Sequence, residues 1–220
     1  MIESILTEEE IRVLGCLIEK EVTTPAYYPL SLNALCNACN QTSSRDPIVS
    51  YDEGIVSLAL EKLKEKGLVD QDNISRVPKF SEMFLKKSRL MPPETAILCV
   101  LMLRGFQTIG ELRTRTERLH SFANLDETMQ TIHTLEEWGY IMLLPRSAGK
   151  KEPRYAHLLS GPIDLQATES VEHKEKMSPN TISSNFVDKE TFLQLQETVN
   201  TMRVELDAVK RGFEDFKKQF

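Results

Sequence analysis

Apolar residues recur at intervals of three and four along much of the chain, which is the spacing of an amphipathic helix. In the first such segment Ile11, Leu14 and Ile18 share one face. Thr7 and Glu10 stand beside this face with the spacing of a capping box, in which each side chain hydrogen-bonds the other residue's free backbone amide. The pattern predicts a helix that begins directly after Thr7.

The same patterns predict two more helices and a pair of strands before residue 89. Ser31 precedes a short apolar face, and Ser50 and Glu53 have the capping-box spacing again. Gly67 is expected to end the third helix, because glycine readily adopts the left-handed conformation found at helix ends. Two short apolar segments within residues 68–80 are then predicted to be strands joined by polar residues.

The same order of elements repeats farther along the chain. Pro92 suits the first turn of a helix. Thr108 and Asn124, each followed three residues later by glutamate, predict the starts of two further helices, and Gly139 predicts the end of the last one. Two apolar segments within residues 140–158 are predicted to be strands around a polar hairpin.

Three helices followed by two short strands, twice in succession, is the plan of tandem winged helix-turn-helix domains. The sequence therefore predicts a mainly α fold with small β wings. We divide it into a first unit, residues 1–88, and a second unit, residues 89–161. The alternative is two unrelated helical bundles with apolar tails. The matching glycines and strand pairs favour the winged helices.

The last part of the chain has a different pattern. Residues 162–188 are rich in polar residues and are predicted to form a linker. Residues 189–220 carry apolar residues that alternate by three and four without a break, which predicts a coiled-coil helix and a homo-oligomer. The alternative is a single amphipathic helix that folds back on the winged helices. The predicted oligomerisation seam contains Leu195, Val199, Met202, Leu206, Val209, Phe213 and Phe216.

Composition and charge limit the class of protein. The sequence has no run of eighteen apolar residues and no signal-peptide pattern, so no membrane association is expected. Four cysteines within apolar helical patterns favour a reducing compartment, and the cytoplasm is the expected location. The net charge of −6 argues against a large phosphate-binding surface. The second unit, however, holds nine Lys and Arg against eight Asp and Glu, so a nucleic-acid surface is expected there.

Two long motifs are distinctive enough to indicate a family. The first extends from Leu14 to Pro47 and contains Thr-Thr-Pro, Tyr-Pro-Leu-Ser-Leu-Asn-Ala-Leu and Arg-Asp-Pro. The second begins at Gly110 with Gly-Glu-Leu-Arg-Thr-Arg and ends near Gly161. Over about three quarters of its length the chain resembles the YceH family of uncharacterised bacterial proteins. The resemblance implies tandem winged helices and a bacterial origin, and it implies no reaction.

The sequence contains no catalytic motif, neither a nucleophile with its base nor a glycine-rich phosphate loop. We therefore expect no enzymatic activity and no cofactor. Cys36 and Cys39 form a C-x-x-C pair, but a zinc site needs two further ligands, and all four histidines lie far downstream. Both cysteines are expected to be packing residues, so no metal site is predicted.

A stripe of amides on the second helix and in the loop after it is a candidate partner-binding site: Asn33, Asn37, Asn40, Gln41 and Arg45. Asparagine is a poor helix former, so its repetition requires an explanation. Amide side chains can hydrogen-bond the loop backbone, with Arg45 and Asp46 pinning the loop. They can also recognise adenine edges or a partner's polar surface. The structural interpretation is favoured over recognition.

Cations gather on and after the second helix of the second unit and around its predicted wing. The candidate DNA-binding residues are Arg113, Arg115, Arg118, Arg146, Lys150, Lys151 and Arg154. Such a group can follow a phosphate backbone, although a solubilising loop would have the same composition. The third helix of each unit begins with acidic residues, which argues against reading bases in the major groove.

The leading prediction is therefore a non-catalytic, oligomeric protein with a regulatory role that binds double-stranded DNA mainly through backbone contacts of its second wing. The alternative is an assembly module that holds a protein partner without direct DNA binding. Winged helices serve both purposes, so the fold does not decide between them.

Overall fold

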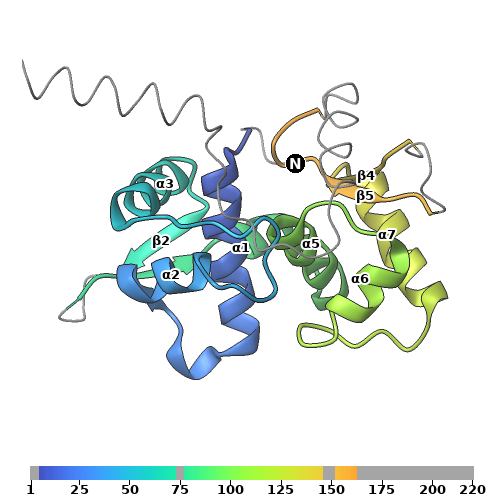
Figure 1. Cartoon of the computed structure of the whole chain (residues 1–220), viewed down its shortest axis with the longest axis horizontal. Coiled ribbons are helices and arrows are strands. Elements are labelled where there is room, and N and C mark those ends of the chain that lie inside the picture. The colour runs from blue at the N-terminus through green and yellow to red at the C-terminus, as the bar shows by residue number, and fades with distance from the viewer. Residues whose placement is uncertain (1–4, 73–76, 146–151, 163–220) are drawn as a thin grey trace, which may run out of the picture. The chain divides into compact units, whose positions relative to one another are not determined.

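The structure is a computed structural model of the chain, and it describes residues 5–72, 77–145 and 152–162. The predicted linker beyond residue 162, the predicted coiled-coil helix with its seam, and the predicted DNA-binding residues Arg146, Lys150 and Lys151 lie outside these residues. The described part is mainly helical and contains small antiparallel sheets (Figure 1). This confirms the predicted mainly α character.

Local capping residues set the starts of the first two helices. α1 (Glu8–Thr23) begins at the predicted capping box, in which Thr7 N donates to Glu10 Oε2 at 2.7 Å and Glu10 N donates to Thr7 Oγ1 at 3.3 Å. α2 (Leu32–Cys39) follows Ser31, whose hydroxyl oxygen accepts a backbone hydrogen bond as its N-cap. Both starts agree with the sequence prediction.

The start of α3 (Glu53–Glu65) differs from the prediction. Asp52, and not Ser50, is the N-cap, because Asp52 Oδ1 accepts a 2.8 Å hydrogen bond from Ile55 N. Aspartate caps a helix as well as serine does, and Asp52 stands immediately before the first helical residue. The prediction of a capping box at Ser50 was wrong. α3 ends before Gly67, which has a φ of 63°, as expected.

A three-stranded antiparallel sheet with the order β1-β3-β2 completes the first unit. β2 (Val69–Asp72) and β3 (Lys79–Glu82) are the predicted strand pair, displaced toward the C-terminus. β1 (Leu30–Ser31) pairs with β3, so that Leu30 lies opposite Phe80. A strand of two residues shows no periodicity of its own, and β1 was therefore not predicted.

A short helix without a clear sequence pattern, α4 (Phe84–Ser88), follows the sheet. The Phe84 ring is buried and meets the ring of Tyr140 edge-on, with centroids 6.1 Å apart and an interplanar angle of 86°. Tyr140 belongs to the second unit, so this aromatic contact joins the two units.

The second unit repeats the order of helices and strands. Its elements are α5 (Pro92–Arg104), α6 (Ile109–Arg115), α7 (Leu125–Glu137), β4 (Ile141–Leu143) and β5 (Tyr155–His157). Thr108 caps α6 and Asn124 caps α7, as predicted. β4 and β5 pair antiparallel, and Gln107 adds an isolated bridge to Tyr155. Gln107 directly precedes Thr108, the N-cap of α6, just as β1 directly precedes α2 in the first unit.

The two units share one core. α1 packs against α2 and α3, and also against α5, which in turn contacts α6 and α7 (Figure 1). α1 and α5 approach closely at Gly15, where an added Cβ would lie only 3.0 Å from Leu103 Cδ2. The apolar side chains of both units therefore form a single cluster. Within the described residues, no helix has both the length and the apolar character needed to cross a membrane.

Candidate nucleic-acid interface

Four of the predicted DNA-binding residues lie in the described part of the second unit. Arg113, Arg115 and Arg118 stand on α6 or just after it, and Arg154 directly precedes β5. Arg113 and Arg118 are exposed, whereas Arg115 and Arg154 are partly buried. Two separate segments of the chain thus contribute to the candidate surface.

Backbone pairing brings these two segments together. Gln107 N donates to Tyr155 O at 3.1 Å, and Tyr155 N donates to Gln107 O at 2.7 Å. The residue before β5 therefore lies beside the start of α6. Arg154 Nη1 donates to Phe106 O at 2.9 Å, and its Nη2 lies 3.9 Å from Glu111 Oε2. Residues 48 positions apart in sequence, such as Phe106 and Arg154, become neighbours in this way.

Glu111 is shared by two arginines. Arg115 Nη2 lies 3.3 Å from Glu111 Oε1, and Arg154 approaches the other carboxylate oxygen. Arg115 also donates a hydrogen bond to the side-chain oxygen of Gln107. One carboxylate between two guanidinium groups leaves net positive charge at this edge, and the same contacts hold α6 against the strand pair.

Arg113 and Arg118 are less constrained. Arg113 Nη2 donates a long hydrogen bond of 3.4 Å to Ala123 O. Neither arginine forms an ion pair with another residue in the part of the chain that the structure describes. Their charges are therefore accessible to an external anion such as a phosphate group.

The start of α7 is poorly suited to reading bases. Asp126 is exposed in the first turn, together with the apolar Leu125, which has 48% of its surface exposed. The Asn124 side chain is already occupied, because its Oδ1 accepts from Glu127 N at 2.8 Å. Negative charge at the position that normally meets base edges disfavours insertion of α7 into a major groove.

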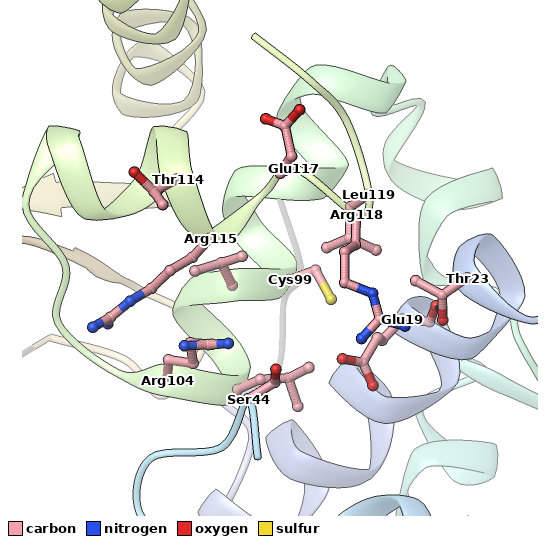
Figure 2. A pocket seen from close by; sticks show the side chains of 12 residues that line it. Glu19, Thr23, Ser44, Cys99, Arg104, Thr114, Arg115, Glu117, Arg118 and Leu119 are labelled. Carbon is pink, nitrogen blue, oxygen red and sulfur yellow. Dashed lines mark hydrogen bonds between the residues drawn. The ribbon is translucent and has the colours of Figure 1, made fainter.

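A cavity of about 190 Å³ lies between α1, α5 and α6 (Figure 2). Three arginines line it, Arg104, Arg115 and Arg118, together with Glu19 of α1. Burial and then the positive charges of Arg115 and Arg45 lower the pKa of the Arg104 guanidinium. Arg104 and this cavity were not predicted from the sequence, because the cavity forms only where α1 meets α5 and α6, which come much later in the chain.

The structure divides the predicted amide stripe into two groups. Asn33 and Asn37 are exposed, and Asn37 Nδ2 donates to Asn33 Oδ1 at 2.9 Å. Asn40 exchanges two hydrogen bonds of 2.8 Å with the backbone of Tyr51, and Gln41 Oε1 accepts from a lysine of α1 at 3.3 Å. Asn40 and Gln41 therefore hold the loop after α2, while Asn33 and Asn37 are accessible to a partner.

Arg45, the fifth residue of that predicted site, lies inside the fold. Its side chain has no exposed surface, and its Nη2 is 2.6 Å from Glu19 Oε2. Nε and Nη2 also donate to Ala38 O at 3.2 and 3.0 Å. Burial raises the pKa of Glu19, but the hydrogen bond and charge of Arg45 outweigh it and lower that pKa below its ordinary value. Arg45 therefore ties the loop to α1 and α2, as the structural interpretation expected, and no surface of it is left for a partner.

Apolar side chains stand on the exposed side of α3. Leu58 has 54% of its surface exposed and Ile55 38%, and Ile48 in the preceding loop has 60%. Isolated exposed apolar residues are common, but several of them on one helix and its leading loop indicate a contact surface. This surface belongs to the first unit and is separate from the arginines of α6.

Buried carboxyl groups occur where α1 approaches the sheet. Glu82 has 2% of its surface exposed, and its Oε2 accepts from Leu85 N at 2.8 Å. Burial, together with the nearby Glu21 carboxyl, raises the pKa of Glu82 to about 7, against the lowering effect of the hydrogen bond from Leu85. Glu82 N donates to Tyr28 Oη at 2.6 Å, so these residues are part of the packing of the first unit.

The cysteines offer no external site. Cys16, Cys36, Cys39 and Cys99 are all buried, and all are free thiols. In residues 5–72, 77–145 and 152–162, no group of three or more His, Cys, Asp or Glu side chains is placed to hold a metal ion. The C-x-x-C pair therefore lies in the packing of α2.

Comparison with known proteins gives a consistent result over nearly the whole chain. Residues 6–150 match the family model described as "Protein of unknown function, DUF480". A "UPF0502 protein" of Pelobacter propionicus is 48% identical over 221 residues, which cover 99% of each chain. Proteins with the same UPF0502 description are 44% identical in Solibacter usitatus, over 98% of each chain, and 44% identical in Geobacter sulfurreducens, over 99% of each chain. The resemblance to the YceH family is consistent with these matches.

Proposed function

We propose that this chain, which belongs to the DUF480 family of bacterial proteins of unknown function, is a non-catalytic DNA-binding protein with two tandem winged-helix units. In this proposal the second unit binds the phosphate backbone of double-stranded DNA, the helix at 189–220 forms a homo-oligomer, and the protein has a regulatory role.

The order and pairing of the elements support the winged-helix part of the proposal. In each unit three α-helices precede a pair of antiparallel strands, β2 and β3 in the first unit and β4 and β5 in the second. In each unit a short segment before the second helix joins the strand pair, β1 in the first unit and Gln107 in the second. A strand pair held beside the second helix in this way is what the wing of a winged helix requires.

The observation that carries the DNA-binding part is the convergence of cations from two elements at one edge of the second unit. Arg115 and Arg154 meet at Glu111, and Arg113 and Arg118 extend the positive surface along α6 and the turn after it. The proposal also includes the predicted residues Arg146, Lys150 and Lys151, which precede Arg154 in the sequence. Because phosphate contacts supply most non-specific affinity, such a surface favours binding along the DNA backbone.

The acidic start of α7 supports backbone contacts over base readout. Exposed Asp126 would be repelled by phosphates if α7 entered the major groove. The proposal therefore includes weak sequence preference and a strong dependence of affinity on salt.

The test is duplex-DNA binding by the full chain at several salt concentrations. Each phosphate contact that is lost should reduce the slope of log affinity against log salt by about 1, so Arg113→Gln and Arg118→Gln should each do so. Lys62→Gln is the matched control, because it removes one exposed charge from α3 of the first unit. Undetectable binding at low salt, or equal slopes for all variants, would contradict the proposal.

A second candidate function is protein assembly through the first unit. The exposed Ile48, Ile55 and Leu58 favour it, because large apolar side chains on an exposed helix are typical of contact surfaces. Asn33 and Asn37 add exposed amides on α2. If the chain fails to bind DNA, cross-linking from a photoreactive amino acid placed at Ile55 would locate the partner. Loss of the cross-linked complex in Leu58→Asp, with the fold intact, would support assembly.

A further inference from the structure

The cavity between α1, α5 and α6 is positively charged, and its charge is not balanced from within. Its lining includes Arg104 at the end of α5, Arg115 and Arg118 on or after α6, and Glu19 and Glu117. In Figure 2 the Arg104 and Arg118 side chains lie on opposite sides of Cys99. The lining thus includes three arginines and two glutamates around a space of about 190 Å³.

The carboxylates do not neutralise these arginines. Glu19 is engaged by Arg45 at 2.6 Å and by Lys20 at 3.2 Å. Glu117 is exposed and accepts a 2.8 Å hydrogen bond from Ser121 Oγ. Glu19 therefore has other cationic partners, and Glu117 is exposed to solvent, which screens its charge, so neither carboxylate is paired with Arg104 or Arg118.

Two of the arginines form no ion pair within the described residues, although the charges of Glu19 and Asp46 act on Arg104 and oppose the lowering of its pKa. Arg115 is paired with Glu111 at 3.3 Å. For Arg104 and Arg118, the described residues provide neither an ion pair nor an acceptor for a side-chain hydrogen bond. Guanidinium groups that face a partly enclosed space without acceptors are suited to bind a carboxylate or phosphate, because their planar fork matches two oxygens at once.

We propose that this cavity binds a small oxyanion ligand, a carboxylate or phosphate compound held between Arg104 and Arg118. The volume is smaller than that of sites for drug-sized ligands, so the ligand has few atoms beyond its anionic group. Burial and then the neighbouring cations lower the pKa of Arg104, and the negative charge of a bound anion would raise that pKa again.

The position of the cavity determines which parts of the chain a bound ligand would contact. α1 belongs to the first unit, whereas α5 and α6 belong to the second, so a bound anion would contact both units at once. Arg118 is also part of the proposed DNA surface. A ligand that occupies Arg118 should therefore compete with DNA, and this consequence rests on the proposed function, whereas the site itself does not.

The site can be tested on the full chain without DNA. Isothermal titration with inorganic phosphate and, separately, with malonate distinguishes a phosphate from a carboxylate ligand, with sodium chloride at equal ionic strength as the blank. We expect saturable binding of one anion per chain by at least one of the two compounds. Arg104→Gln and Arg118→Gln should each weaken it at least tenfold, while Lys62→Gln should leave it unchanged.

The use of two arginine variants allows loss of the binding site to be distinguished from misfolding. Arg104 is partly buried, so its variant is checked for folding by circular dichroism, while Arg118 is exposed and its replacement should not disturb the fold. Absence of saturable binding with both anions, or equal affinity in Arg118→Gln and the unchanged protein, would overturn the proposed site. In a separate titration, saturating anion should reduce DNA affinity about as much as Arg118→Gln does. An unchanged DNA affinity would overturn the shared use of Arg118.

Discussion

Glu19 of α1 and Arg45 of the loop after α2 form an ion pair of 2.6 Å in which the guanidinium has no exposed surface. Twenty-six residues separate the two along the chain. The same guanidinium hydrogen-bonds the last turn of α2 through Ala38 O, so one side chain ties the loop to two helices.

Breaking this pair should destabilise the first unit strongly. Arg45→Met leaves the half-buried Glu19 carboxylate without its main partner, and the loss of one member of a buried pair typically costs about 3 kcal/mol. Urea unfolding at pH 7 measures the change. Replacing both residues, in Glu19→Gln with Arg45→Met, should cost less than the sum of the single changes. Lys20→Gln is the control, because that lysine contacts the same carboxylate from a more exposed position and should cost about 1 kcal/mol or less.

Glycine at position 15 should be required for the contact between α1 and α5. In Gly15→Val the new Cβ would lie 3.0 Å from Leu103 Cδ2, and overpacking of this kind costs about 1–3 kcal/mol. Thermal unfolding of the full chain measures the loss. Gly110→Ala provides the contrast, since a Cβ there meets nothing within 4 Å and should stabilise α6 by up to about 1 kcal/mol. An unaltered melting temperature in Gly15→Val would mean that the helices are less closely packed than described.

The buried Glu82 should make stability fall as pH rises. Its pKa is about 7 in the folded chain against 4.5 for an ordinary glutamate, so the folded state holds more protons between these values. The free energy of unfolding therefore decreases as pH increases from about 4.5 to 7. Glu82→Gln should remove this decrease in denaturant titrations at a series of pH values. Glu21→Gln should make this fall in stability smaller, because the Glu21 carboxyl is one of the causes of the raised pKa of Glu82. Glu61 is exposed, so Glu61→Gln is the control and should leave the pH dependence unchanged.

The predicted coiled coil should respond to a single charge in its seam. Leu206→Lys places an ammonium group at a position expected to be buried between helices, so the oligomeric mass measured by light scattering should fall. Asp207→Lys introduces the same charge at a position outside the seam and should leave the mass unchanged. A mass that is equal in both variants and in the unchanged protein would contradict self-association through residues 189–220.

The elements that sequence predicted well are those whose cause is local. Thr7 with Glu10, and Thr108 with Glu111, lie three residues apart, so the capping boxes that start α1 and α6 were visible in the sequence and are present in the structure. The error at α3 was also local: both Ser50 and Asp52 can cap a helix, and their spacing alone does not rank them.

Features that depend on distant contacts escaped prediction. β1 exists because Leu30 meets Phe80 fifty residues later, and its own two residues have no strand pattern. The burial of Arg45 depends on Glu19, and the cavity beside Arg104 exists only when α1, α5 and α6 are assembled. Residue type and spacing located the arginines of α6, and Arg115 pairs with Glu111 within that helix, but the approach of Arg154 to Glu111 depends on the bridge between Gln107 and Tyr155.

The packing of α1 on α5 has a consequence for any ligand that contacts both units. Tandem domains on a flexible linker present their second surface at an effective concentration set by linker length. Here the shared core takes the place of such a linker, so the spacing between the apolar side of α3 and the arginines of α6 is fixed by helix packing. Any partner that contacted both surfaces would have to match that spacing, to which the close approach of α1 and α5 at Gly15 contributes.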